Sequence, residues 1–110
     1  MRVIILDENL VWSARLKLGV ESLGHEAVVL YAPGELPAAE VGIVNLGSRR
    51  FPPDEWIPRL RSIGARVVAH AGHKEKPLLA QGKEAGAELI VTNGELTHKL
   101  GDVLARATSD

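Results

Sequence analysis

Short runs of aliphatic and β-branched residues alternate along this chain with segments whose apolar residues recur every three or four positions. Each pair is separated by turn-forming residues. Such alternation predicts a parallel sheet with right-handed crossovers and helices on both faces. The predicted strands are 2–6, 27–31, 41–46, 66–71 and 89–92. This one feature restricts the chain to the α/β class, with a five-stranded parallel sheet.

Of the five segments that follow the predicted strands, four have a helical pattern, and the segment after the second strand does not. The predicted helices lie between Asn9 and Gly24, after Pro52-Pro53-Asp54 up to Ile63, from about Pro77 to Gly86, and from about Glu95 to Ala105. Gly24 stands where a helix end favours a positive φ. Pro58 cannot donate a helical hydrogen bond, so we expect a late start or a kink in the second of these helices. Residues 32–40 contain two prolines and a glycine, so we expect at most one helical turn and a vestigial helix there.

The composition excludes several classes of function. The 110 residues include 13 Lys and Arg against 14 Asp and Glu, and a net charge of -1 argues against nucleic acid or an anionic membrane as the partner. Cysteine is absent, which excludes disulfides, a thiolate nucleophile and Cys-ligated metals. No apolar run approaches the roughly 20 residues of a membrane span, and Asp7 and Glu8 interrupt any signal peptide. We expect one cytoplasmic domain over 1–107, with residues 108–110 frayed.

Polar residues collect where the predicted strands end. In an open parallel sheet, ligands bind at the carboxyl ends of the strands. The residues at those ends are Asp7, Glu8 and Asn9 after the first strand, Asn45 to Ser48 at the third, His70 to His73 at the fourth, and Thr92 to Glu95 at the fifth. This edge is therefore the predicted pocket, with an acidic pair, Asp7 and Glu8, and a rim of His70, Ala71, His73, Thr92 and Asn93.

Two stretches and the order of elements resemble the receiver domain of two-component response regulators. VIILDEN (3–9) is similar to the family's acidic pair that holds Mg²⁺, and KEAGAELIVT (83–92) to its turn into strand five. The resemblance covers nearly the whole chain and implies a flavodoxin-like three-layer sandwich. Three positions depart from it: the family's phosphoacceptor Asp falls on Asn45, its strand-four Thr or Ser on Ala71, and its strand-five Lys on Asn93.

These departures alter the function that the resemblance implies. An amide is no nucleophile for phosphoryl transfer, and without the lysine no cation balances a phosphate. The missing carboxylate also weakens a Mg²⁺ site, because hard cations prefer anionic oxygens. We therefore expect a non-catalytic, stand-alone pseudo-receiver that binds no cofactor. By the resemblance, it would act through a protein partner or as a homodimer, using residues 75–105.

A second resemblance indicates an enzyme as the alternative. LDEN (6–9) and LGHEAVVL (23–30) are similar to small PIN-like toxin ribonucleases, which hold Mg²⁺ or Mn²⁺ with clustered carboxylates. In this alternative Asp7, Glu8 and Glu95 would bind the metal, although Gly94 occupies the position of the family's late acid. Against it, Asp7 has a plainer interpretation as the cap of the following helix.

Further alternatives rest on single clusters. Residues 71–76, with Lys74 and Lys76, would suit a phosphate or another small ligand, but they form no P-loop. His70 and His73 are too few for a zinc site, which needs three or four ligands. Asn93-Gly94 reads as a turn. A cationic cluster lies near Phe51 and Trp56, and we interpret it as a solvated face. It consists of Arg49, Arg50, Arg59 and Arg61.

Overall fold

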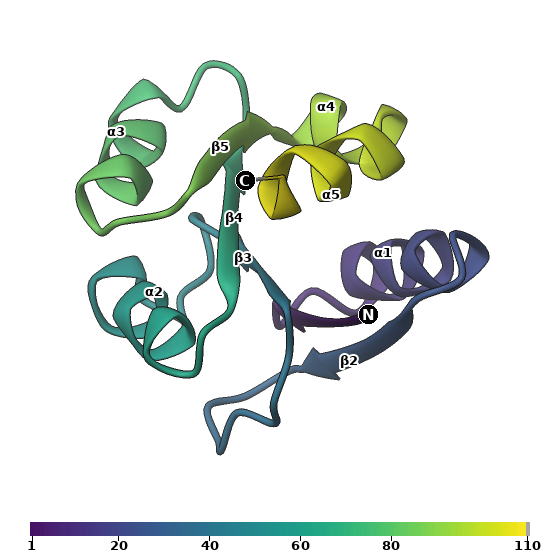
Figure 1. Ribbon diagram of the computed structural model, residues 1–110. Helices are drawn as coiled ribbons and strands as arrows, with labels where there is room; N and C mark the ends of the chain where they lie inside the picture. Colours follow the sequence, from purple (N-terminus) through teal and green to yellow (C-terminus); the bar gives the residue numbers. More distant parts are fainter. Residues whose placement is uncertain (110) are drawn as a thin grey trace.

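Five parallel strands form one sheet in the order β2-β1-β3-β4-β5, with helices on both faces (Figure 1). The computed structural model describes residues 1–109. The strands are β1 (Arg2–Leu6), β2 (Glu26–Leu30), β3 (Val41–Asn45), β4 (Arg66–Ala71) and β5 (Leu89–Thr92). The helices are α1 (Leu10–Ser22), α2 (Pro53–Ser62), α3 (Lys76–Glu84), α4 (Asn93–His98) and α5 (Leu100–Thr108). The predicted α/β three-layer architecture is therefore confirmed.

The sheet separates two hydrophobic layers. Successive side chains of a strand point to opposite faces, so Val3 and Ile5 of β1 enter one layer, and Ile4 and Leu6 enter the other. Helices α1, α4 and α5 complete the first layer, and α2 and α3 complete the second (Figure 1). Because both faces are covered, the strands are almost continuously apolar, which is why alternation is missing from their sequences.

The link between β2 and β3 contains no helix, in agreement with the expected vestigial element. Three arginine side chains hold this loop by donating to its backbone carbonyl groups. The bonds run from Arg2 to Ala38 at 3.1 Å, from Arg50 to Tyr31 at 3.3 Å and from Arg59 to Gly34 at 3.3 Å. Leu36 and Ala39 of the loop pack against the second layer. The hydrogen bonds of the arginine side chains and the two apolar contacts thus hold this loop in place without a packed helix.

Several boundaries differ from those predicted. The single helix expected over 95–105 is two helices, α4 and α5, separated at Lys99, whose φ of -131° and ψ of 38° leave the helical region. Asn93 and Gly94 are not a turn but the first residues of α4, because the Thr92 hydroxyl caps that helix by accepting from the Glu95 N–H at 3.1 Å.

Other boundaries move by a residue or two. Helix α2 begins at Pro53, whose missing N–H costs nothing at a first helical position, so the late start expected from Pro58 was wrong. Strands β2 and β3 each end one residue early. Thr108 is not frayed, because it ends α5 and its hydroxyl donates to the Leu104 carbonyl at 2.9 Å; Ser109 is extended, and Asp110 lies outside the described residues. None of the helices in the described part is long and apolar enough to cross a membrane.

Candidate functional site

The pairing of the strands brings the predicted pocket residues together at one edge of the sheet. Leu6 of β1 lies beside Val44 of β3, so the next residues, Asp7 and Asn45, are neighbours. Asn45 in turn lies beside His70 of β4. Asp7 and His70 are each only 1% exposed. The carboxyl ends of β1, β3 and β4 therefore place three polar side chains in one row, two of them fully buried.

Asp7 is held by hydrogen bonds to both of its carboxylate oxygens. The Asn45 side-chain amide donates to Oδ2 at 3.1 Å, and the Asn9 N–H donates to Oδ1 at 2.9 Å. The Asn45 Oδ1 accepts from the Gly47 N–H at 2.9 Å, so both ends of the amide are used. A buried carboxylate needs donors of this kind. Residue 45 supplies one as an amide, and an ionised carboxylate there could not.

The helix cap that the sequence assigned to Asp7 belongs to its neighbour Asn9. The Asn9 Oδ1 accepts from the Trp12 N–H at 2.9 Å, which is the N-cap bond of α1. Asp7 instead accepts from the backbone N–H of Asn9, the residue just before the first residue of α1. The interpretation of Asp7 as the cap was therefore wrong.

Glu8 is bound by the loop between β3 and α2. Its carboxylate accepts from the Ser48 hydroxyl, with the longer of the two contacts at 3.0 Å, and from the Arg49 N–H at 3.3 Å. Burial by itself raises the pKa of Glu8, but the hydrogen bonds from Ser48 and the backbone outweigh it, and the pKa falls below its usual value. Sequence analysis missed this role of Ser48. A hydroxyl residue shortly after a strand end was the available signal.

His70 is the least satisfied group of the site. Its Nδ1 lies 2.7 Å from Asn93 Oδ1, whereas its buried Nε2 has no hydrogen-bond partner within the described residues. The Trp12 indole lies 5.9 Å away between ring centroids, and its buried Nε1 lacks a partner in the same way. Burial lowers the pKa of His70, opposed by the hydrogen bond with Asn93 and the charge of Asp7. Burial therefore favours the neutral form of the imidazole over the charged form.

The remaining rim residues do not join this cluster. Ala71 is buried in the second layer, His73 is exposed, and Thr92 is occupied as the cap of α4. Among residues 1–109, no three His, Cys, Asp or Glu side chains converge as they would around a metal ion. Glu95 instead pairs with Arg106 of α5 at 2.9 Å. The carboxylate cluster of the nuclease alternative is thus not assembled.

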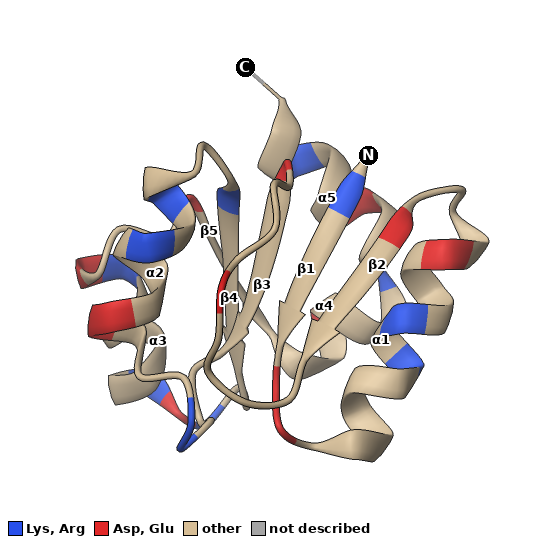
Figure 2. Cartoon of the chain, turned by 90° about the horizontal axis from the view of Figure 1, so that it is seen from below, with Lys and Arg blue, Asp and Glu red and all other residues tan. Residues whose placement is uncertain are grey.

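The cationic cluster is tied into the structure. Arg59 stacks over the Trp56 ring at 3.9 Å from its centroid, and Arg61 pairs with Glu88 at 3.1 Å. Charges of both signs are spread over the helices of both layers (Figure 2). The expected interpretation of this cluster as a solvated face fits these contacts, with the addition that Arg50 and Arg59 hold the loop between β2 and β3.

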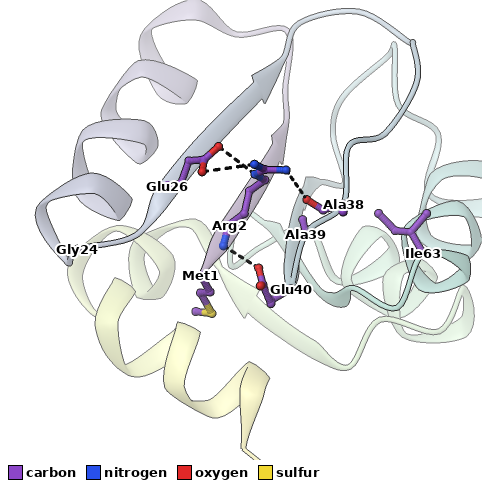
Figure 3. A pocket seen from close by; sticks show the side chains of 8 residues that line it. All are labelled: Met1, Arg2, Gly24, Glu26, Ala38, Ala39, Glu40 and Ile63. Atoms are coloured by element: carbon purple, nitrogen blue, oxygen red, sulfur yellow. Dashed lines mark hydrogen bonds and ion pairs between the residues drawn. The ribbon is translucent and has the colours of Figure 1, made fainter.

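A pocket of about 570 Å³ lies at the opposite, amino end of the strands (Figure 3). Arg2 spans it, with its Nε 2.9 Å from a Glu26 oxygen and its backbone N–H donating to Glu40 at 2.7 Å. That backbone hydrogen bond lowers the pKa of the exposed Glu40 carboxyl. In this pocket Arg2 and Glu26 pair with each other, and Glu40 is bound by a backbone N–H. None of the predicted site residues lines the pocket.

Comparison with known proteins identifies the fold. No family model and no curated protein matches the chain. A response regulator receiver domain from Bermanella marisrubri is similar with a TM-score of 0.81 at 14% identity, covering 98% of both chains. The chemotaxis response regulator CheY4 of Vibrio cholerae gives 0.80 at 15% identity, covering 96% of this chain and 97% of that one.

A third similar structure is that of a phosphorylated response regulator. A response regulator from Burkholderia pseudomallei, solved with a phosphorylated aspartic acid, calcium and citrate, has a TM-score of 0.80 at 18% identity. The match covers 98% of this chain and 66% of that one. The fold of this chain is therefore the flavodoxin-like fold of response regulator receiver domains.

Proposed function

We propose that this protein is a receiver-like signalling module that works without phosphorylation, by associating with a protein partner or with a second copy of itself. The observation that carries the proposal is the bond from the Asn45 amide to the Asp7 carboxylate at 3.1 Å. The site also contains no lysine at the end of β5, where Asn93 lies beside His70. We further propose that the protein acts in the cytoplasm and needs no metal or cofactor.

The chemistry of the site supports this proposal. The similar regulator from Burkholderia pseudomallei carries its phosphoryl group on an aspartic acid. Transfer of that group needs a carboxylate oxygen as the nucleophile and cations to balance the charge. In this chain the residue that we place at that position is Asn45. Its side-chain amide is not a nucleophile, and the amide nitrogen donates a hydrogen bond to Asp7. We infer that Asn45 has a structural role at the position where the phosphorylated regulator has its reactive aspartic acid.

The surface expected from the resemblance, residues 75–105, is polar. It includes Glu95, which pairs with Arg106 just beyond its end. None of the large exposed hydrophobic side chains of the described residues lies in it. A polar interface of this kind forms contacts that weaken with added salt. We propose that any partner bound there is recognised mainly through charge.

Acetyl phosphate tests the proposal directly. The protein is incubated with acetyl phosphate and Mg²⁺ at neutral pH, and its intact mass is measured, with the Burkholderia pseudomallei regulator as the positive control for the reagents. We expect no added phosphoryl mass on the unaltered protein. The matched variant Asn45→Asp supplies the missing carboxylate. If either protein is labelled, we expect it to be this variant. A stoichiometric adduct on the unaltered protein that hydroxylamine removes would overturn the proposal.

A metal titration separates this function from the nuclease alternative. Mg²⁺ or Mn²⁺ is added while Trp fluorescence is followed, because Trp12 lies beside His70 and reports on the site. We expect no saturable change up to millimolar metal. Micromolar binding that Asp7→Ala abolishes would contradict the proposal and would call for an RNA cleavage assay.

A further inference from the structure

Strand β2 is the outermost strand on one side of the sheet, and its outer edge is open. No helix or strand of the described chain lies beyond that edge (Figure 1). None of the five residues of β2 is fully buried, whereas every residue of β1 after Arg2 is. The link from β2 to β3 contains no helix that would cover this part of the sheet. β2 is therefore the least covered of the apolar strands at this end of the sheet.

The hydrogen bonds to β1 show which backbone groups of β2 face outward. The Glu26 N–H donates to the carbonyl just before β1 at 2.9 Å, and the Leu30 carbonyl accepts from the N–H just after β1 at 3.2 Å. Because backbone groups point alternately to the two sides of a strand, every second residue from Glu26 to Leu30 bonds to β1. The N–H and C=O groups of Ala27 and Val29 therefore point away from the sheet. No backbone hydrogen bond from elsewhere in the described chain reaches them.

β2 lacks the features with which natural proteins block an edge strand. Such features include lysine side chains, proline, a bulge or a covering segment. The strand reads EAVVL, with its one charged side chain, Glu26, at the first position. Its pairing with β1 continues without a bulge over all five residues, whereas β5 at the opposite edge has only four residues. An apolar strand with open backbone groups favours pairing with a further strand.

The strand is complementary to a second copy of itself. In an antiparallel pair centred on Val28, Ala27 of each copy exchanges two hydrogen bonds with Val29 of the other. Val28 then faces its own counterpart in a non-hydrogen-bonded pair, where the side chains lie closest. Val28 is β-branched, and such side chains pack well against their neighbours on a sheet. This register uses the whole length of the strand.

The charges at the two ends of β2 favour the antiparallel arrangement. The Glu26 side chain pairs with Arg2 of its own chain at 2.9 Å and is still 59% exposed. At the other end, the exposed Arg50 donates to the Tyr31 carbonyl at 3.3 Å. An antiparallel pair places Glu26 opposite Leu30 of the second copy, one residue from Tyr31, and so brings its carboxylate towards Arg50. A parallel pair would instead place Glu26 beside Glu26, which opposes association.

We propose that two copies of this chain join through the outer edges of β2, antiparallel about a two-fold axis, so that their sheets become one continuous sheet. The interface is closed, because each copy has one β2 edge and uses it, so association stops at the dimer. This inference rests on the proposed function in one respect, that the protein acts by association, and it names a second copy as the partner. It does not use residues 75–105.

Cysteine cross-linking tests the register, because the chain has no cysteine of its own. In the dimer, the two Cα atoms of Val28→Cys lie about 4.5 Å apart, within the range of a disulfide. We expect a covalent dimer on a non-reducing gel after mild oxidation. Val29→Cys is the matched control, because its counterpart lies diagonally across at about 7–8 Å, and it should cross-link at least ~10-fold more slowly. Ile63→Cys, at an exposed residue after α2, measures cross-linking by random collision.

Sedimentation equilibrium measures the association itself. We expect the unaltered protein to form a reversible dimer. Val28→Lys places two like charges opposite each other at the two-fold axis and should raise the dissociation constant at least ~10-fold. Val28→Thr keeps the β-branched shape without a charge and should retain the dimer. The Val28 side chain is not fully buried, and circular dichroism checks that both variants are folded.

Several results would overturn the inference. They are a monomer at millimolar concentration, equal rates of cross-linking for Val28→Cys and Val29→Cys, or a dimer as tight in Val28→Lys as in Val28→Thr. The last result would place the association on another surface. The acetyl phosphate experiment does not involve β2, so a failure of this inference is distinguishable from a failure of the proposed function.

Discussion

At the scale of single residues, the polar groups of the site differ in how completely they are bonded. The Asp7 carboxylate has a donor at each oxygen, and Asn45 uses both ends of its amide. His70 uses one ring nitrogen and leaves the other buried without a recorded partner. An unsatisfied buried polar atom costs stability. The hydrogen bonds of Asp7 and Asn45 therefore offset the cost of their burial, whereas the Nε2 of His70 has no such bond within the described residues.

The first residue-scale prediction concerns the cap of α1. Asn9→Ala removes the bond from the Trp12 N–H to the Asn9 side chain. We expect the free energy of unfolding to fall by about 1 kcal/mol, the usual effect of losing an N-cap. Urea denaturation measures the change. Asn9→Asp keeps an acceptor at the same place and should recover most of it, and equal losses in the two variants would argue against capping as the cause.

The second residue-scale prediction concerns the pH dependence of the free energy of unfolding. Burial lowers the pKa of His70 in the folded protein, while an unfolded histidine titrates at about 6.5. Below that pH the unfolded chain binds a proton that the folded protein does not, so the free energy of unfolding falls as the pH is lowered. The slope from this one group is at most about 1.4 kcal/mol per pH unit.

Urea denaturation at several pH values between 7.5 and 5.5 measures this slope. His70→Asn retains a polar group able to reach Asn93 but cannot titrate, so the dependence should become flatter by up to one proton. His73→Asn, at an exposed histidine, is the matched control and should leave the dependence in place. An unchanged slope in His70→Asn would show that other groups cause it.

At the scale of elements, close packing explains two glycines whose roles are not conformational. A Cβ at Gly42 of β3 would lie 2.7 Å from the Leu60 side chain of α2. A Cβ at Gly82 of α3 would lie 2.9 Å from Leu46. Glycine within a strand often marks such a close approach. Because Gly42 and Gly82 have no side chain, α2 and α3 can both pack closely against the sheet.

The element-scale prediction follows from the contact at Gly42. Gly42→Ala inserts a methyl group where Leu60 already packs, and we expect a loss of about 1–3 kcal/mol in the free energy of unfolding. Leu60→Val makes room for that methyl group at a cost of its own. The double variant should therefore lose less than the sum of the two single variants. Additive losses would mean that Leu60 is not what the new methyl group meets.

At the scale of the whole molecule, one sheet is shared by two hydrophobic layers. Trp12 packs against the layer of α1, α4 and α5, and Trp56 is buried in the layer of α2 and α3. Every strand contributes side chains to both layers. We therefore expect both layers to lose their packing together with the sheet.

This arrangement predicts one cooperative unfolding transition. The variants Trp12→Phe and Trp56→Phe each leave a single tryptophan, which reports on one layer only. For each variant, the urea midpoint from tryptophan fluorescence should agree with the midpoint from circular dichroism of the same variant, as two-state unfolding requires. Fluorescence of the remaining Trp12 that changes before the circular dichroism would show that the α1 layer opens on its own.

What the sequence by itself determined was local. The bounds of β4 and β5 agree with those predicted, and Gly24 has the expected positive φ of 87° after α1. Apolar periodicity reports burial within one element, and a glycine reports the backbone at its own position. The fold class followed from the order of these elements, because alternating strands and helices leave few topologies.

Only the tertiary structure decided how the site is bonded. Asn45 and Asp7 are 38 residues apart, Ser48 and Glu8 are 40 apart, and His70 and Asn93 are 23 apart. Which of these side chains meet depends on strand order and register, which periodicity does not record. The same holds for the open edge of β2: the sequence shows that the strand is apolar, but only the strand order shows that it is outermost.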